Sequence, residues 1–234
     1  MFQGAPRVSI QHVRDETPCV IVDDALLDPQ AVVEVAIAHR NAFSRPVGNA
    51  YPGLELPLPD SVVQQFAEQF EQHAAFTLQV EQVLQASGRL SLATLRADQL
   101  SAIQRVCHRD RLFTSPGQRA IAGVLYLFHD ERLGGTSFFR PRGTPAETEL
   151  LMRDLSRNDV ESLKHLDSQN PGYLTRSTPH FELTATVSPK WNRMIWYDGS
   201  EFHGSHIEDP DLLSTDPSSG RLTLNLFLLC SSRR

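Results

Sequence analysis

Alternation of apolar and polar residues is clearest near the end of the chain, in GRLTLNLFLL at residues 220–229. Leucine occupies every second position there, and Arg221, Thr223 and Asn225 occupy the positions between them. Because successive side chains of a β-strand point to opposite faces, this pattern predicts a strand with one apolar and one polar face.

Other short runs rich in β-branched, aromatic and aliphatic residues are separated by turn residues and also predict strands. The first is PCVIV at 18–22, and the later ones cover residues 90–95, 102–108, 120–128, 135–139, 181–187 and 191–197.

Helical signals are concentrated in the first third of the chain. Asp28 followed by Pro29 predicts a helix that extends to about His39, with aspartate as the N-cap and proline at the first helical position. Asp60 is expected to cap a second helix, in which apolar residues recur at helical spacing. These residues are Val62, Val63, Phe66, Phe70 and Ala74. A third helix is expected near residues 146–166.

This order of elements, helices first and many short strands later, predicts an α+β fold with a double-sheet β-core and the N-terminal helices on one outer face. The sequence contains no internal repeat, low-complexity tract or Pro/Gly/Ser-rich linker. We therefore expect residues 1–234 to form a single domain.

Composition restricts the possible partners. Of the 234 residues, 40% are hydrophobic and 21% charged, and the formal net charge is −6. An acidic balance gives no reason to expect binding to nucleic acid or to an anionic membrane, so a small molecule or a protein is the expected partner. No signal-peptide pattern and no apolar run of roughly 18 residues occurs, which predicts a cytoplasmic protein. The three scattered cysteines predict buried, reduced thiols.

Candidate chemistry begins at His108 and Asp110. If residues 102–108 are a strand, these two side chains project from the same side of the backbone and can reach one point. Imidazole and carboxylate together suit first-row metals such as Fe(II), Zn, Mn or Ni. The H-x-D pattern alone is common, and an ordinary hydrogen-bonded histidine is the alternative.

A third ligand is available in WNRMIWYDGSEFHGSHI at 191–207, where a predicted strand and a DGS turn precede His203 and His206. One segment that supplies His and Asp, and a distant one that supplies His, is the pattern of the 2-His-1-carboxylate triad. After this third ligand, Arg221 with Thr223 two residues on could bind a carboxylate, because a guanidinium donates two parallel hydrogen bonds and a hydroxyl adds one. A solvated arginine on a half-exposed strand is the alternative for Arg221.

Taken in order, these segments resemble the 2-oxoglutarate- and Fe(II)-dependent dioxygenases, especially the prolyl 4-hydroxylase-like type. The matching pieces are VIVDDALLDPQAVVEVA, HRD at 108–110, AGVLYL at 122–127, GGTSFF at 134–139, MIWYDGSEFH at 194–203 and GRLTLNLFL at 220–228. The resemblance implies a double-stranded β-helix, or jelly roll. It also implies oxidative decarboxylation of 2-oxoglutarate, coupled to hydroxylation of a small molecule, an amino acid or a peptide side chain.

Carried over to this sequence, the resemblance implies that His108, Asp110 and His203 bind iron. It implies that Arg221 pairs with the distal carboxylate of 2-oxoglutarate and that Thr223 assists.

Several alternatives stay open beside this assignment. His206 competes with His203 for the role of third ligand, and we prefer His203 because it directly follows the strand and the turn. Tyr126 could donate a hydrogen bond to 2-oxoglutarate or be a buried tyrosine bonded elsewhere. Because Asp110 is a carboxylate, no open halide position is expected and halogenation is disfavoured. The segment at 204–220 is longer than is usual in the family, which predicts a projecting loop.

Two other function classes remain: a non-redox cupin-like metal protein, such as an isomerase or hydrolase, and a binding module without catalysis. Arg221 favours the oxygenase over the cupin-like protein, because a 2-oxo acid cosubstrate requires a carboxylate partner near the metal. The sequence does not identify the substrate or the oligomeric state.

Overall fold

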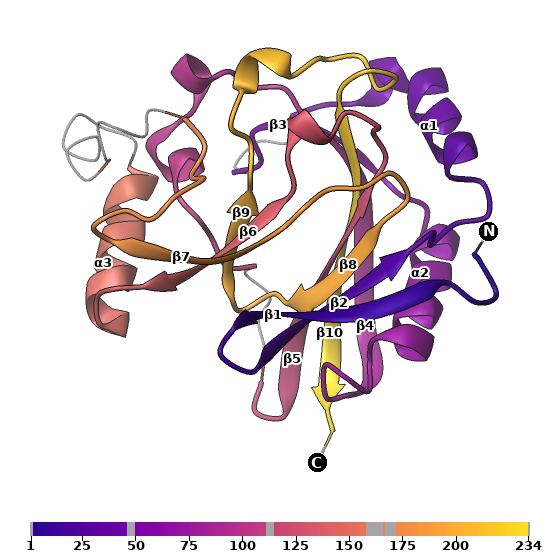
Figure 1. The fold of residues 1–234 in the computed structure, drawn as a ribbon, viewed down its shortest axis with the longest axis horizontal. Helices are drawn as coiled ribbons and strands as arrows, with labels where there is room; N and C mark the ends of the chain where they lie inside the picture. The colour runs from indigo at the N-terminus through magenta and orange to yellow at the C-terminus, as the bar shows by residue number, and fades with distance from the viewer. Residues whose placement is uncertain (1, 46–49, 111–114, 158–165, 167–171, 234) are drawn as a thin grey trace.

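The computed structural model describes residues 2–45, 50–110, 115–157, 166 and 172–233. Two antiparallel sheets form its centre (Figure 1), one with seven strands in the order β1-β2-β8-β5-β10-β4-β3 and one with three in the order β7-β6-β9. The strands are β1 (Arg7–Arg14), β2 (Thr17–Asp23), β3 (Gly53–Pro57), β4 (Val80–Ala93), β5 (Gln118–Tyr126), β6 (Thr136–Pro141), β7 (Phe181–Val187), β8 (Met194–Asp198), β9 (Phe202–Ser205) and β10 (Arg221–Ser232).

Three α-helices flank the sheets: α1 (Pro29–Ala38), α2 (Asp60–His73) and α3 (Pro145–Ser156). Helices α1 and α2 lie together on one side of the seven-stranded sheet, whereas α3 lies at the opposite side of the molecule, next to β7 (Figure 1). None of the described helices has the length and apolar character needed to cross a membrane.

The two faces of the seven-stranded sheet belong to different cores. Leu222 and Leu224 of β10 pack with Phe66 and Phe70 of α2 in the helix-side core. The opposite face, which we call the inner face, contributes Tyr126 to a second core shared with the three-stranded sheet. Alternation along each strand thus directs one set of side chains to the helices and the other between the two sheets.

Several expected elements are confirmed. Helix α1 begins at Pro29, and the side chain of its N-cap Asp28 accepts a hydrogen bond from the Ala31 N–H at 3.1 Å. Strands β2, β5, β6, β7, β8 and β10 fall on predicted runs, and β4 ends on one. The three cysteines are buried and free. Helix α3 ends at Ser156, and the part of its predicted range at 158–165 lies outside the described residues.

Two expectations are wrong. Residues 102–108 do not form a strand: Ala102–Arg105 is a 3₁₀-helix, because the Ser101 N–H donates to the Gln104 side chain and closes a capping box. Asp60 is not the N-cap of α2 but its first helical residue, after Pro59 in extended conformation. Strands β1, β3 and β9 and the first half of β4 were not predicted.

Candidate metal centre

Backbone pairing brings His108 and His203 side by side. The His108 N–H donates to the His203 carbonyl at 2.9 Å, and the His203 N–H donates to the His108 carbonyl at 2.8 Å. This antiparallel bridge places the two imidazole rings with their centroids 4.5 Å apart. This one pair of residues, rather than a strand at residues 102–108, therefore positions the His108 side chain.

Asp110 is fixed by the turn that follows β8. Its N–H donates to the Gly199 carbonyl at 2.9 Å, and the Gly199 N–H donates to the Ala120 carbonyl of β5, also at 2.9 Å. A Cβ at position 199 would lie 3.0 Å from Oδ2 and 3.3 Å from Cβ of Asp110. The glycine of the DGS turn thus leaves the space in which the Asp110 side chain lies.

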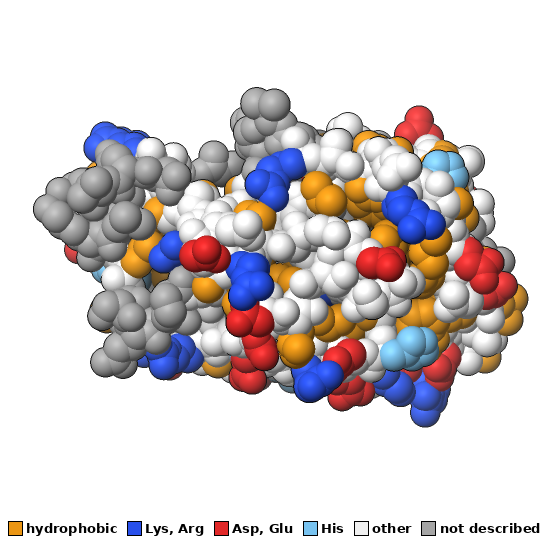
Figure 2. Space-filling view, turned by 90° about the horizontal axis from the view of Figure 1, so that it is seen from above, with side chains coloured by type: hydrophobic (Ala, Val, Ile, Leu, Met, Phe, Trp, Pro, Cys, Tyr) orange, Lys and Arg blue, Asp and Glu red, His pale blue; other side chains and the backbone are white. Residues whose placement is uncertain are grey.

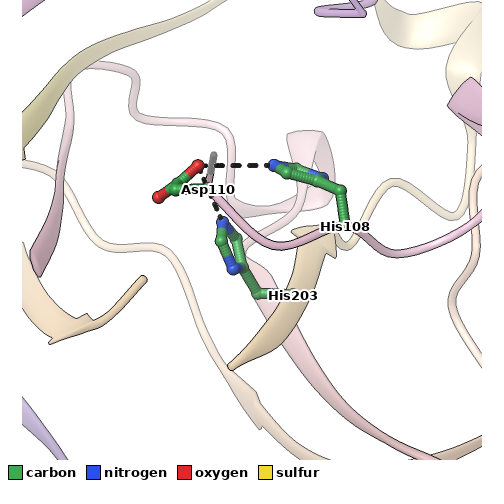
Figure 3. Close-up of side chains that lie close together, drawn as sticks. All are labelled: His108, Asp110 and His203. Carbon is green, nitrogen blue, oxygen red and sulfur yellow. Dashed lines mark ion pairs between the residues drawn. The ribbon is translucent and has the colours of Figure 1, made fainter. Parts of the chain in front are cut away.

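The three side chains converge (Figure 3). The Nε2 atoms of His108 and His203 lie 3.9 and 3.8 Å from Asp110 Oδ1. One ligand atom from each residue can be chosen so that all lie within 4.8 Å of one another. First-row metals bind imidazole nitrogen and carboxylate oxygen at about 2.0 to 2.2 Å, so donors at this spacing can share one ion.

Hydrogen bonds around the cluster leave metal-binding atoms of His203 and Asp110 free. His203 Nδ1 lies 2.9 Å from the Glu201 carbonyl, which can only accept, so Nδ1 carries the proton and Nε2 keeps its lone pair. Asp110 Oδ2 is buried and has no hydrogen-bond partner among the described residues. A buried carboxylate oxygen without a partner is unfavourable, and a cation would satisfy it.

Burial also sets the protonation states. It lowers the pKa of His203 to about 4, so the imidazole is neutral at pH 7, the form that binds metals. Burial and the neighbouring His203 lower the pKa of His108 as well, with less force because 54% of that side chain is exposed. Burial raises the pKa of Asp110. The residues present therefore fit a divalent first-row metal.

His206 lies outside this cluster. Its Nδ1 is 2.6 Å from the hydroxyl of Ser137 on β6, and its Nε2 is 3.3 Å from a carboxylate oxygen of Glu208. Of the two candidate histidines, the structure thus brings only His203 to His108 and Asp110.

Arg221 lies on the inner face at the start of β10 and is 2% exposed. Its Nε–H and Nη2–H donate to the carbonyls of Gly134 and Gly135 at 3.1 and 2.8 Å. Gly134 adopts a positive φ of 83°, and a Cβ there would lie 1.7 Å from the His206 carbonyl oxygen. Among the described residues, no carboxylate forms an ion pair with Arg221, so none of them compensates its buried charge.

Polar side chains surround this guanidinium. The Tyr126 hydroxyl lies 2.8 Å from Thr136 Oγ1, and the Thr223 hydroxyl donates to the Ser91 carbonyl at 3.4 Å. Ser91 is directly opposite Thr223 in the sheet, and its own hydroxyl is fully buried without a partner in the described part of the chain. A buried hydroxyl without a described partner, on the same face as a guanidinium that no described carboxylate neutralises, fits a small anion such as a carboxylate.

Sequence reasoning missed Gly199 and Ser91. The DGS turn was recognised, but its contact with Asp110 depends on tertiary structure. A sequence signal for Ser91 exists, because LSL at 90–92 repeats the apolar-polar alternation of residues 222–226 and places the serine on the polar face.

Comparisons with known proteins agree with this architecture. The structure is similar to that of HygX from Streptomyces hygroscopicus with nickel and 2-oxoglutarate bound, at TM-score 0.51 and 13% identity, over 93% of this chain and 84% of that chain. The non-heme alpha ketoglutarate dependent epimerase SnoN from nogalamycin biosynthesis gives a TM-score of 0.49 at 12% identity, over 92% and 77% of the two chains. No curated protein sequence matches the chain.

The likeness to HygX concerns the fold, and it confirms the resemblance to 2-oxoglutarate oxygenases at that level. The sequence match to a known family covers residues 4–228. The chain therefore belongs to the family described as a family of unknown function (DUF6445).

Proposed function

We propose that this protein is an Fe(II)- and 2-oxoglutarate-dependent oxygenase, a single domain with a jelly-roll core. The observation that carries the proposal is the convergence of His108, Asp110 and His203 on one metal-sized point. Two imidazoles and one carboxylate leave three positions of an octahedral metal open, which suffices for a chelating cosubstrate and oxygen. The shared fold supports it, since HygX holds nickel and 2-oxoglutarate.

In this proposal the three clustered side chains hold the iron. Arg221 donates to the distal carboxylate of 2-oxoglutarate, with help from the hydroxyls of Thr223 and Tyr126. The lack of a described carboxylate beside Arg221 supports this assignment more than the strand pattern does, because a buried guanidinium is more stable with an anion beside it. Bound Fe(II) with 2-oxoglutarate would supply the oxidising chemistry: dioxygen is the oxidant, one oxygen atom enters succinate as the cosubstrate loses carbon dioxide, and the other is inserted into a substrate C–H bond.

The chain's own residues orient the reactants and exclude water. The Glu201 carbonyl fixes the ring of His203, and the Gly199 turn fixes Asp110. Tyr197 packs against His203 with ring centroids 4.8 Å apart, which shields one side of the cluster from solvent. We propose hydroxylation of a small molecule, an amino acid or a peptide side chain as the outcome. On the face seen in Figure 2, positive and negative side chains are interspersed, which suits a small ligand better than a polyanion.

The test is anaerobic addition of Fe(II) and then 2-oxoglutarate to metal-free protein. A visible metal-to-ligand charge-transfer band is expected when the cosubstrate chelates the iron, and the His203→Ala variant should not show it. Metal binding without the band would instead indicate a non-redox, cupin-like metal protein. Absence of metal binding would indicate a binding module.

A further inference from the structure

Arg89 lies on the inner face of β4 and takes no part in the roles described so far. In the sheet it is directly opposite Asn225 of β10. Its guanidinium carbon lies 4.5 Å from the centre of the Phe227 ring, and its Nε lies 2.7 Å from a carboxylate oxygen of Glu55 on β3. The Arg89 side chain is 32% exposed, whereas that of Glu55 is only 3% exposed.

These two contacts hold the guanidinium in one orientation. The buried Glu55 fixes the Nε edge, and the Phe227 ring supports one face through a cation–π contact. The two Nη atoms carry four further N–H donors, and none of them has a hydrogen-bond partner in the described part of the chain. A pre-oriented fork of donors that is open to solvent is suited to a planar two-oxygen acceptor.

Strand register places Arg89 between the metal centre and Arg221. Asn225, its neighbour on β10, is opposite Val124 of β5. Two residues before Val124, the next inner-face residue of β5 is Ala122. Tyr197 is opposite Ala122 in the sheet and packs on His203, so the metal cluster lies beside Ala122. In the other direction along β5, the inner-face residue after Val124 is Tyr126. Tyr126 is opposite Thr223 of β10, which lies two residues from Arg221 on the same face.

We infer that Arg89 binds a carboxylate of the substrate, so that the substrate is an organic acid whose apolar part lies against Phe227. This inference rests on the proposed function and adds the substrate class to it. Glu55 offsets part of the positive charge, which suits a singly charged carboxylate better than a doubly charged phosphate.

The experiment uses phenylacetate, which joins a carboxylate to an aromatic ring, and phenylacetamide, which has the same shape without the charge. Each is titrated calorimetrically into Ni(II)-loaded protein saturated with 2-oxoglutarate. We expect the acid to bind about tenfold more tightly than the amide, as charge-assisted hydrogen bonds require.

Three variants separate the role of Arg89 from a structural one. Glu55→Gln combined with Arg89→Gln removes both charges without leaving a buried unpaired carboxylate, and should reduce the acid affinity to that of the amide. Arg89→Lys should retain part of the acid affinity, because lysine keeps the charge but not the fork.

Arg119→Gln is the matched control: Arg119 is similarly exposed, at 28%, and pairs with Asp198 at 2.7 Å, but it is on the helix-side face. It should bind the acid as the unmodified protein does.

Binding of 2-oxoglutarate is measured in the same series before the acid is added. Failure at that step overturns the proposed function. If 2-oxoglutarate binds, three outcomes would overturn the Arg89 site alone. They are equal affinities for the acid and the amide, absence of acid binding, and an unchanged acid affinity in the double variant. An equal loss of 2-oxoglutarate affinity in the double variant would also overturn it, because Arg89 would then belong to the cosubstrate site.

Discussion

On β10, two sets of equally buried side chains face opposite ways. Leu222 and Leu224 are at most 1% exposed and pack with the helices, whereas Arg221 and Thr223 are at most 2% exposed and face the three-stranded sheet. Burial of a leucine stabilises the fold by about 1.5 to 3 kcal/mol. Burial of a guanidinium without a carboxylate is unfavourable. The comparison supports the proposal that the helix-side face mainly stabilises the protein, whereas the polar part of the inner face binds ligands.

The same division is present on β4 and β5. Leu90 and Leu92 alternate with Ser91, whose hydroxyl is unpaired among the described residues, and Ile121 and Leu125 alternate with inner-face residues that include Tyr126. Substitutions on the two faces should therefore separate stability from ligand binding.

The largest effect is expected at the metal cluster. His203→Ala should abolish binding of Fe(II) or Mn(II), because it removes a coordinating nitrogen outright. His206→Ala should leave metal affinity largely intact, because His206 lies near Ser137 and Glu208 rather than near a proposed ligand. Metal titration of the two variants measures the difference, and the reverse ranking would make His206 the ligand.

On the helix-side face, Leu224→Ala should lower the free energy of unfolding by about 2 to 5 kcal/mol, through lost burial and the cavity left behind. Urea unfolding of the metal-free protein measures this effect. Leu84→Ala is the control on β4, because Leu84 is 48% exposed and should change stability by less than about 0.5 kcal/mol. Metal affinity of the folded Leu224→Ala protein should be unchanged; a marked loss would mean that the two faces are not separable.

On the inner face, Arg221→Ala should retain the metal but weaken 2-oxoglutarate binding by at least about tenfold, because each charge-assisted bond contributes about 1.5 to 3 kcal/mol. Arg221→Lys should restore only part of the affinity, since lysine lacks the planar fork. Anaerobic titration with Fe(II) held constant is the measurement. Equal affinities in the variant and the unmodified protein would mean that Arg221 serves only to hold the Gly134 and Gly135 carbonyls.

The smallest effect is expected for Ser91→Ala. The variant should bind 2-oxoglutarate roughly 2- to 12-fold more weakly, the equivalent of one hydrogen bond. Without ligand it should be as stable as the unmodified protein or more stable, because the change removes an unpaired buried hydroxyl. Calorimetric titration and thermal unfolding give the two quantities. A loss of stability with unchanged affinity would place Ser91 with the structural residues.

Local sequence signals were reliable where one short segment decides the structure. Asp28 and Pro29 start α1 because capping and a fixed φ act within a few residues. The leucine alternation of β10 predicted both its strand and its two faces. Strand β1 was missed because its alternation is short: only Val8 and Ile10 alternate with polar residues, and most of its side chains are exposed. Strand β9 is only four residues long and exists through pairing with β6.

By itself, the sequence determined which residue types are available for chemistry and which faces of its strands are apolar. The local geometry around His108 was predicted incorrectly, since the preceding residues form a 3₁₀-helix rather than a strand.

Only the tertiary structure decided that His108 pairs with His203 and that Gly199 holds Asp110. It also decided that Arg221 and Arg89 face the same interior as the metal cluster. These placements depend on pairing between segments far apart in the chain, and such pairing is fixed by the packing of the whole fold rather than by the residues on either side.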